Sequence, residues 1–220
     1  MAKLSEIQNK TSEPVKQLRL VSSLESCGKG LFNQDGSPNY EETSAISFCI
    51  CDVHEDENDR NFTRIAIEGD DFEKAFDVEN PNQRIIVVLP FDQKIITGQH
   101  YIKGGIADCG LLSVKELSFV EFKTNALTPT IESIKEEYEK AMNQLWHTYE
   151  VIKERCLSKK VDIDTEVDID FYIVNDKMFA QRVDQYLPVK VSSQQQAFQT
   201  DFQQEHNGYS LFFDTKREFV

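Results

Sequence analysis

The pattern of apolar and polar positions predicts several short strands in the first half of the chain. Apolar or alternating runs at 44–53, 62–67 and 84–89 are rich in Ile, Val and Phe, as β-strands are, and 94–97 is a further short candidate. Residues 70–78 are strongly acidic and are interpreted as a helix or turn. The segment 27–42, rich in Gly, Asn and Asp, and the charged segment 54–60 are predicted to be loops.

Two apolar runs in the middle of the chain, 106–114 and 117–124, predict a β-hairpin. Their polar junction places the turn near Lys115 and Glu116. Both runs are apolar at successive positions as well as at alternate ones. That pattern is typical of strands covered on both faces, so we expect helices on each side of the sheet.

The strongest helix prediction spans 131–156. Its apolar residues recur at three- and four-residue intervals and form one buried stripe: Ile131, Ile134, Tyr138, Ala141, Leu145, Tyr149 and Ile152. Thr128 or Thr130 can cap its start, with Pro129 at the entry. Near the N-terminus we expect a short helix, a break at Pro14 and a second helix over 14–25.

The last third of the chain predicts one more strand, a helix and a final strand. Residues 161–174 alternate strictly, with apolar side chains on one face and acidic ones on the other. We interpret the acidic face as solvated, because no EF-hand spacing or central glycine accompanies it. A glutamine-rich helix at 192–205 and a strand at 209–213 follow.

Together these elements predict a single α/β domain with a central mixed β-sheet flanked by helices. Its core would span about 44–174, with a helical segment at 1–43 and an extension at 175–220. No apolar run approaches bilayer length and the N-terminus is polar, which predicts a soluble, cytoplasmic protein without a membrane role. Five cysteines without paired metal-site spacing are expected to be free thiols.

The charge balance argues against a free-standing nucleic-acid binder. The formal net charge is −14, whereas nucleic-acid binding needs cations that displace counterions from phosphates. A local basic groove or a basic partner would be needed. The four histidines are dispersed and form no ligand-spaced cluster.

Charged side chains inside the predicted hairpin are the main chemical signal. Asp108 lies in the first strand, and Glu121 and Lys123 lie in the second among apolar neighbours. A charge within an apolar strand is costly unless a partner or a metal compensates it. Glu121 and Lys123 are two residues apart and therefore share a face. A turn centred on Lys115-Glu116 would set Lys123 opposite Asp108, so that all three converge; a one-residue slip would separate them.

In these residues the segment from about 106 to 149 resembles the PD-(D/E)xK, or restriction-endonuclease-like, nuclease superfamily. The resemblance implies that Asp108 and Glu121 bind Mg²⁺ or Mn²⁺, with the backbone carbonyl of Phe122 as a further ligand, and that Lys123 activates or orients the attacking water. Many members carry an alanine-x-x-glutamine-leucine helix whose glutamine approaches the site. Here that pattern is Ala141-Met142-Asn143-Gln144-Leu145.

The resemblance also implies an acidic residue upstream of the hairpin. Glu41 and Glu42 precede the first clear strand and are weak candidates, ahead of Glu25; we take Glu42 as the metal ligand among them. The implied function is metal-dependent phosphodiester hydrolysis on a restriction-endonuclease-like fold. By analogy the substrate is DNA rather than RNA, in a restriction or phage-defence setting.

A second hypothesis belongs to another class of function. The chain would keep the nuclease-like fold but act as a non-catalytic interaction or regulatory subunit, whose acidic surface binds a basic protein partner or mimics nucleic acid. In that case Asp108 and Lys123 form a cross-strand ion pair and Gln144 is an ordinary polar helix residue. Assembly into a homo-oligomer stays open.

Overall fold

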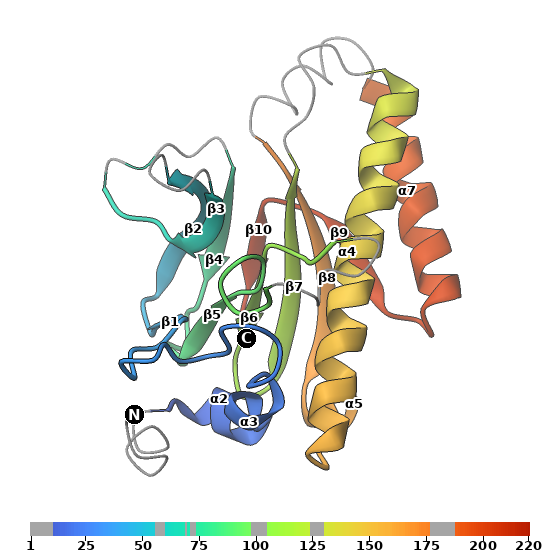
Figure 1. The fold of residues 1–220 in the computed structure, drawn as a ribbon. Helices are drawn as coiled ribbons and strands as arrows, with labels where there is room; N and C mark the ends of the chain where they lie inside the picture. Colours follow the sequence, from blue (N-terminus) through green and yellow to red (C-terminus); the bar gives the residue numbers. More distant parts are fainter. Residues whose placement is uncertain are drawn as a thin grey trace.

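The computed structural model describes residues 11–55, 60–68, 70, 74–97, 105–123, 130–176 and 188–220. Its fold is mixed α/β, as predicted, but it contains two mixed sheets instead of one (Figure 1). A helical layer covers one face of the larger sheet, but the smaller sheet covers the other, so the helices expected on that second face are wrong: an apolar strand face buries it equally well. The hydrophobic core is accordingly divided into two clusters, one on each side of the larger sheet.

The larger sheet has six strands in the order β1-β5-β6-β7-β8-β9. The pairs from β1 through β7 are antiparallel, whereas β8 is parallel to β7 and β9 is parallel to β8. The strands are β1 Glu41–Thr43, β5 Ile86–Pro90, β6 Cys109–Leu112, β7 Glu116–Lys123, β8 Asp168–Asn175 and β9 Ser210–Phe213. Strand β7 lies inside the sheet and is buried along its whole length.

The smaller sheet has four strands in the order β10-β4-β2-β3, namely β10 Lys216–Glu218, β4 Ala75–Glu79, β2 Ser47–Glu55 and β3 Arg60–Ile65. It packs Ile50, Phe76 and Val78 against the even-numbered side chains of β7, such as Val120. The helix or turn predicted for 70–78 is therefore wrong for its second half. Ala75, Phe76 and Val78 are buried in strand β4, because the apolar face of the larger sheet compensates for the acidic neighbours.

The helical layer consists of α2 Glu13–Gln17, α3 Leu20–Ser23, α4 Ile131–Ser158, α5 Ile163–Glu166 and α7 Pro188–Glu205. Helices α4 and α7 lie side by side along the sheet (Figure 1). Helix α4 is confirmed with Thr130 as its cap, which exchanges hydrogen bonds with Ser133 in a capping box. Its predicted stripe is buried from Ile134 to Ile152, and Ile131 is half-buried.

The break in the N-terminal helix differs from the prediction. Pro14 stands in the first turn of α2, where its missing N–H costs nothing, and the chain turns at Arg19 instead. Arg19 has a φ of 51°, a left-handed conformation that separates α2 from α3. The short helix expected before Pro14 falls largely outside the described residues.

Residues 161–174 are not one strand, although their alternation does separate two faces. The chain forms the turn α5 before β8 begins at Asp168. The acidic side chains remain at the surface as predicted, with Asp164, Glu166 and Asp168 exposed, although two of the acidic residues have partners. Asp164 accepts hydrogen bonds from Tyr149 and Lys153, and Asp170 pairs with Arg217 of β10.

Several boundaries shift at the remaining elements. The predicted loop at 54–60 is shorter, because His54 and Glu55 extend β2 and Arg60 begins β3; residues 56–59 lie outside the described part. Instead of a strand at 94–97, the chain makes only isolated bridges through Ile96. Residues 188–218 contribute α7, β9 and β10 to the two-sheet fold.

The five cysteines are all free thiols, four of them buried and Cys49 half-buried. Among the described residues no helix is both long enough and apolar enough to cross a membrane.

Candidate active site

The hairpin β6–β7 brings Asp108 and Glu121 together. Cys109 is in register with Val120, so Asp108, the residue before β6, stands opposite Glu121. The Asp108 backbone N–H donates to Glu121 Oε2 at 3.1 Å. This register differs by two residues from the predicted one, because the turn lies at Val114-Lys115 and Glu116 already belongs to β7. An even shift preserves the face of each side chain, so the predicted convergence survives.

Lys123 and Gln144 complete the cluster. Lys123 Nζ donates to Glu121 Oε1 at 2.7 Å and to Gln144 Oε1 at 2.8 Å. Glu121 is 2% exposed and Lys123 is 6% exposed, whereas Asp108 and Gln144 are half-buried. The four residues come from β7, from the segment before β6 and from the middle of α4. The structure thus joins all four residues predicted for the catalytic core.

Helix α4 fixes the segment that carries Asp108. The Gln144 amide nitrogen donates to the Ile106 carbonyl at 3.2 Å, and the Ala107 N–H donates to Thr148 Oγ1 at 2.7 Å. Gly105, at a φ of 83°, packs against Gln144: a Cβ there would stand 3.1 Å from Gln144 Cγ. Gln144 therefore positions both Lys123 and the chain leading to Asp108.

The carboxyl groups have unusual proton affinities. Burial raises the pKa of Glu121 to about 7, even though its ion pair with Lys123 acts in the opposite direction. Burial, together with the charges of Glu121 and Asp52, raises the pKa of Asp108 well above its ordinary value. Two adjacent carboxylates with raised pKa values are typical of a site that binds a cation or exchanges protons.

The predicted further ligands are less well supported by the geometry. The Phe122 N–H donates to Asp108 Oδ2 at 2.6 Å, but this contact uses the N–H and not the carbonyl that was predicted as a ligand. Glu42 is exposed on the edge strand β1, separated from β6 by β5. Glu41 accepts a hydrogen bond from the Ile65 N–H of β3 at 2.9 Å and is thus held against the smaller sheet. Glu25 is exposed near α3. None of the hydrogen bonds or ion pairs found in the described residues joins these glutamates to Asp108.

Two acidic residues near the cluster were missed by the sequence analysis. The Asp92 N–H approaches the Asp108 carbonyl at 3.4 Å, and burial raises the pKa of Asp92 to about 6. Asp52, in β2, adds to the raised pKa values of Asp108 and Asp92 through its charge. The predicted strand at 44–53 contained Asp52, but no sequence pattern indicated which sheet this strand would face.

Pre-formed metal cages are absent from the described part of the chain: no three His, Cys, Asp or Glu side chains are arranged there to hold an ion. Asp108 and Glu121 instead form a two-carboxylate site. Such a site suits Mg²⁺, which prefers oxygen ligands, keeps several of its waters and is commonly held by one or two carboxylates.

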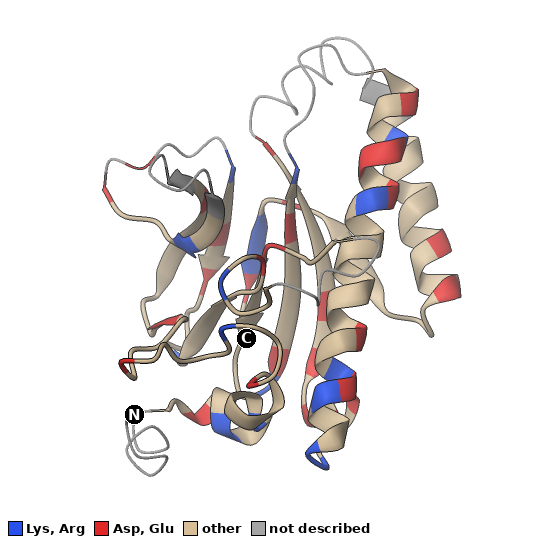
Figure 2. Cartoon of the chain, in the orientation of Figure 1, with Lys and Arg blue, Asp and Glu red and all other residues tan. Residues whose placement is uncertain are grey.

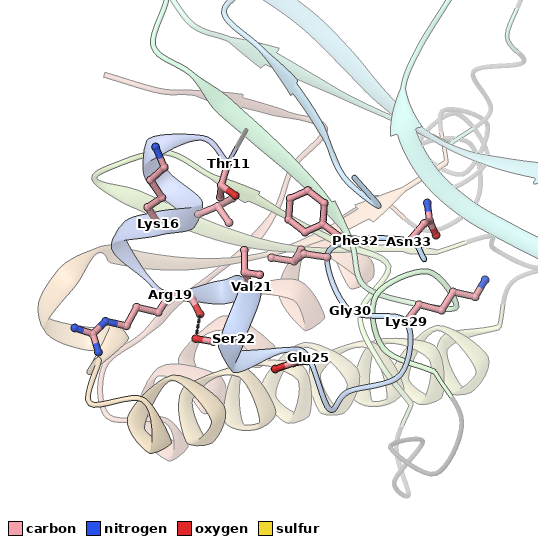
Figure 3. Close-up of a pocket in the computed structure, with 12 residues that line it drawn as sticks. Thr11, Lys16, Arg19, Val21, Ser22, Glu25, Lys29, Gly30, Phe32 and Asn33 are labelled. Atoms are coloured by element: carbon pink, nitrogen blue, oxygen red, sulfur yellow. Dashed lines mark hydrogen bonds between the residues drawn. The ribbon is translucent and has the colours of Figure 1, made fainter. Parts of the chain in front are cut away.

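A cavity of about 640 Å³ lies elsewhere, between α2, α3 and the following loop. Its lining is apolar at Val15, Leu31 and Phe32, and includes none of the four clustered residues. The side chains of Lys16, Arg19 and Lys29 extend in different directions instead of converging (Figure 3), and the Arg19 guanidinium binds the Lys159 carbonyl. The cavity has the size of a ligand pocket but lacks convergent polar groups.

Searches of protein-family models, curated proteins and solved structures found no match to this chain.

Proposed function

We propose that this protein is a metal-dependent nuclease that hydrolyses phosphodiester bonds, with Asp108, Glu121, Lys123 and Gln144 as its active site. One observation carries the proposal: residues separated by up to 36 positions, each expected from the resemblance to PD-(D/E)xK nucleases, converge through direct hydrogen bonds. An ion pair between neighbouring strand residues does not by itself require that a glutamine from the facing helix accept a hydrogen bond from the same ammonium group.

The residues fit a hard divalent cation, Mg²⁺ or Mn²⁺. Asp108 and Glu121 supply adjacent carboxylate oxygens, and burial raises the pKa of both groups, so ionising them in the folded chain is costly. A bound cation would remove that cost, polarise the scissile phosphate and lower the pKa of a bound water.

Lys123 is the residue that would orient the attacking water. Its ammonium group is held between the Glu121 carboxylate and the Gln144 amide oxygen, which fixes two of its three N–H directions. Gln144 is a positioning residue in this proposal, because it acts through Lys123 and through the Ile106 carbonyl.

The substrate we propose is DNA, by analogy with the family. The acidic surface limits how tightly the protein can bind it. Basic residues are scattered among acidic ones along the described chain rather than gathered in one stripe (Figure 2). Association with a polyanion should therefore be weak, and only shallowly salt-dependent because few phosphates are neutralised, unless a basic partner or a second copy assists.

The same surface supports the second candidate, a non-catalytic interaction subunit. The net charge of −14 favours a basic protein partner over a nucleic acid. In that case the ion pair between Lys123 and Glu121 is structural.

A nuclease assay separates the two candidates. Wild-type protein is incubated with plasmid DNA, single-stranded DNA and RNA, with Mg²⁺, with Mn²⁺ and with chelator. We expect metal-dependent cleavage that Asp108→Asn and Lys123→Gln abolish. Asp168→Asn, at an exposed position of β8, is the matched control and should cleave normally. Cleavage that survives both site substitutions would refute the assignment, and no cleavage of any substrate would favour the interaction subunit.

A further inference from the structure

Helix α4 holds both ends of one backbone peptide group. The carbonyl of Ile106 and the N–H of Ala107 belong to the same planar unit. The carbonyl accepts a hydrogen bond from the Gln144 side chain at 3.2 Å, and the N–H donates to Thr148 Oγ1 at 2.7 Å. Gln144 and Thr148 are four residues apart and therefore lie on one face of the helix. Two contacts at opposite ends of a planar group fix its orientation.

The Thr148 hydroxyl has a defined direction. Its oxygen lies 2.7 Å from the main-chain carbonyl of Gln144, to which it donates its only proton. A lone pair of the same oxygen therefore remains for the Ala107 N–H. Thr148 and Ala107 are both 0% exposed. If the hydroxyl were removed, the Ala107 N–H would become a buried donor without its acceptor, which is costly.

Asp108 follows directly after this peptide group. Its N–H donates to Glu121 Oε2 at 3.1 Å, and its carbonyl accepts the Phe91 N–H at 3.0 Å. Only the α-carbon of Ala107 separates the held peptide group from the Asp108 N–H. A rotation of the held peptide group would therefore displace the Asp108 N–H from the Glu121 carboxylate.

We propose that Thr148 is a positioning residue of the candidate active site: by holding the Ala107 N–H, it sets the place of Asp108 relative to Glu121. The catalytic consequence of this inference rests on the proposed nuclease function, whereas the positioning itself does not. The alanine-x-x-glutamine-leucine pattern ends at Leu145, so Thr148 lies outside the residues on which the resemblance to nucleases depends.

Gln144 extends the effect of α4 to Lys123. Its amide nitrogen holds the Ile106 end of the peptide group, and its amide oxygen accepts a hydrogen bond from Lys123 Nζ at 2.8 Å. Thr148 holds the other end of the same peptide group one helical turn away. The position of α4 therefore determines the positions of the Lys123 ammonium group and of the segment before β6 together.

Two pairs of variants isolate the Thr148 hydroxyl. Thr148→Val keeps nearly the shape of the wild-type side chain without the hydroxyl, and Thr148→Ala differs from Thr148→Ser only in the hydroxyl. The second pair decides if Thr148→Val does not fold. Thr200→Val is the matched control, because Thr200 Oγ1 also donates to the carbonyl four residues earlier, at 2.9 Å, but lies exposed on α7.

Amide hydrogen exchange, followed by nuclear magnetic resonance on the full chain, tests the positioning. Rates are compared with those of the central β8 amides, which report global unfolding. We expect the Ala107 and Asp108 amides to exchange about tenfold faster in the two variants without the hydroxyl, because one buried hydrogen bond is lost. Thr148→Ser and Thr200→Val should exchange as the wild type does. Unchanged exchange at Asp108 in the hydroxyl-free variants would reject the positioning role.

Cleavage of DNA with Mg²⁺, at a temperature where every variant is folded, tests the catalytic consequence. We expect kcat to fall about 10–100-fold without the hydroxyl, as for other residues that support a metal site, with KM nearly unchanged. Thr148→Ser should restore most of the loss. A threonine that only stabilises the fold would lower the melting temperature and leave kcat unchanged, and that result overturns the catalytic part. Wild-type protein that cleaves no substrate overturns the proposed function, while the exchange rates still decide the position of Asp108.

Discussion

Asp108 and Glu121 are joined reciprocally: the Asp108 N–H donates to the Glu121 carboxylate, and the Asp108 carboxylate accepts the N–H of Phe122, the residue after Glu121. Each side chain is thus fixed by the backbone of the opposite strand. These hydrogen bonds hold two carboxyl groups close together, which disfavours the simultaneous ionisation of both. Under the proposed function, a bound cation would offset that cost.

The thermal stability of the protein should increase when Mg²⁺ is added, if Asp108 and Glu121 bind it. Mg²⁺ at a hundred times its dissociation constant should stabilise the wild type by about 2.7 kcal/mol, which corresponds to about 5–10 °C in melting temperature at this chain length. Asp108→Asn should lose that increase, because it removes one of two carboxylates. Thermal melts with and without Mg²⁺ measure it, with Asp168→Asn as the control; an equal increase in Asp108→Asn would contradict the site.

The pH dependence of stability should follow Glu121. Its pKa of about 7 in the folded state lies above the ordinary value of 4.5, so the folded chain binds this proton more tightly than the unfolded chain does. The resulting stabilisation is present below about pH 4.5 and is lost as the pH rises through about 7. We expect the metal-free protein to lose several degrees of melting temperature across this window, since about 1 kcal/mol shifts it by about 2–4 °C.

Glu121→Gln tests the origin of that pH dependence. The variant cannot titrate at this position, so its melting temperature should change less between pH 5 and pH 8 than that of the wild type. Saturating Mg²⁺ should also flatten the wild-type profile, because a cation favours the ionised carboxylate. Identical profiles for the variant and the wild type would show that other groups cause the dependence.

Gln144→Ala should reduce activity more than stability. It removes the acceptor that holds Lys123 and the donor to the Ile106 carbonyl, and loss of such a supporting residue typically costs about 10–100-fold. Asn143→Ala, at the exposed neighbouring position of α4, is the control. A structural role alone would lower the melting temperature but leave the pH profile of cleavage unchanged, whereas displacement of Lys123 should shift that profile.

Alanine substitutions at two glycines test the packing against Gln144, because only one of the glycines contacts it. Gly105 and Gly208 have φ values of 83° and 88°, so an alanine at either position carries a similar backbone cost, about 1–3 kcal/mol. Only at Gly105 would the new Cβ press on Gln144; at Gly208 it meets nothing within 4 Å. We expect both variants to melt lower and only Gly105→Ala to lose activity. Equal activity in the two variants would show that the position of Gln144 does not affect catalysis.

The site was more predictable than the architecture around it, and particular residues show why. Glu121 and Lys123 share a face by strand periodicity alone, and Asp108 joined them because only the parity of the hairpin mattered, not its exact register. The contact with Gln144 was expected from the resemblance. Asp52 could not be predicted as a neighbour, because its position depends on the packing of one sheet on another. Nothing in the local pattern of the 44–53 strand specifies that packing.

The same limit explains the error at β4. Phe76 and Val78 are surrounded by acidic residues, and their burial requires the partner face of Val120 and Phe122. Strand propensity is decided by such tertiary context more than by local sequence.

Strands β9 and β10 are separated only by Asp214 and Thr215, yet β9 belongs to the six-stranded sheet and β10 to the four-stranded one. Arg217 then binds Asp170 and Glu116, and Phe219 is fully buried between the sheets. Because only two residues separate β9 from β10, a displacement of β9 within the larger sheet is transmitted directly to β10 in the smaller one. The two sheets are therefore expected to move as one unit at this edge, with Arg217 and Phe219 as the side chains that couple them.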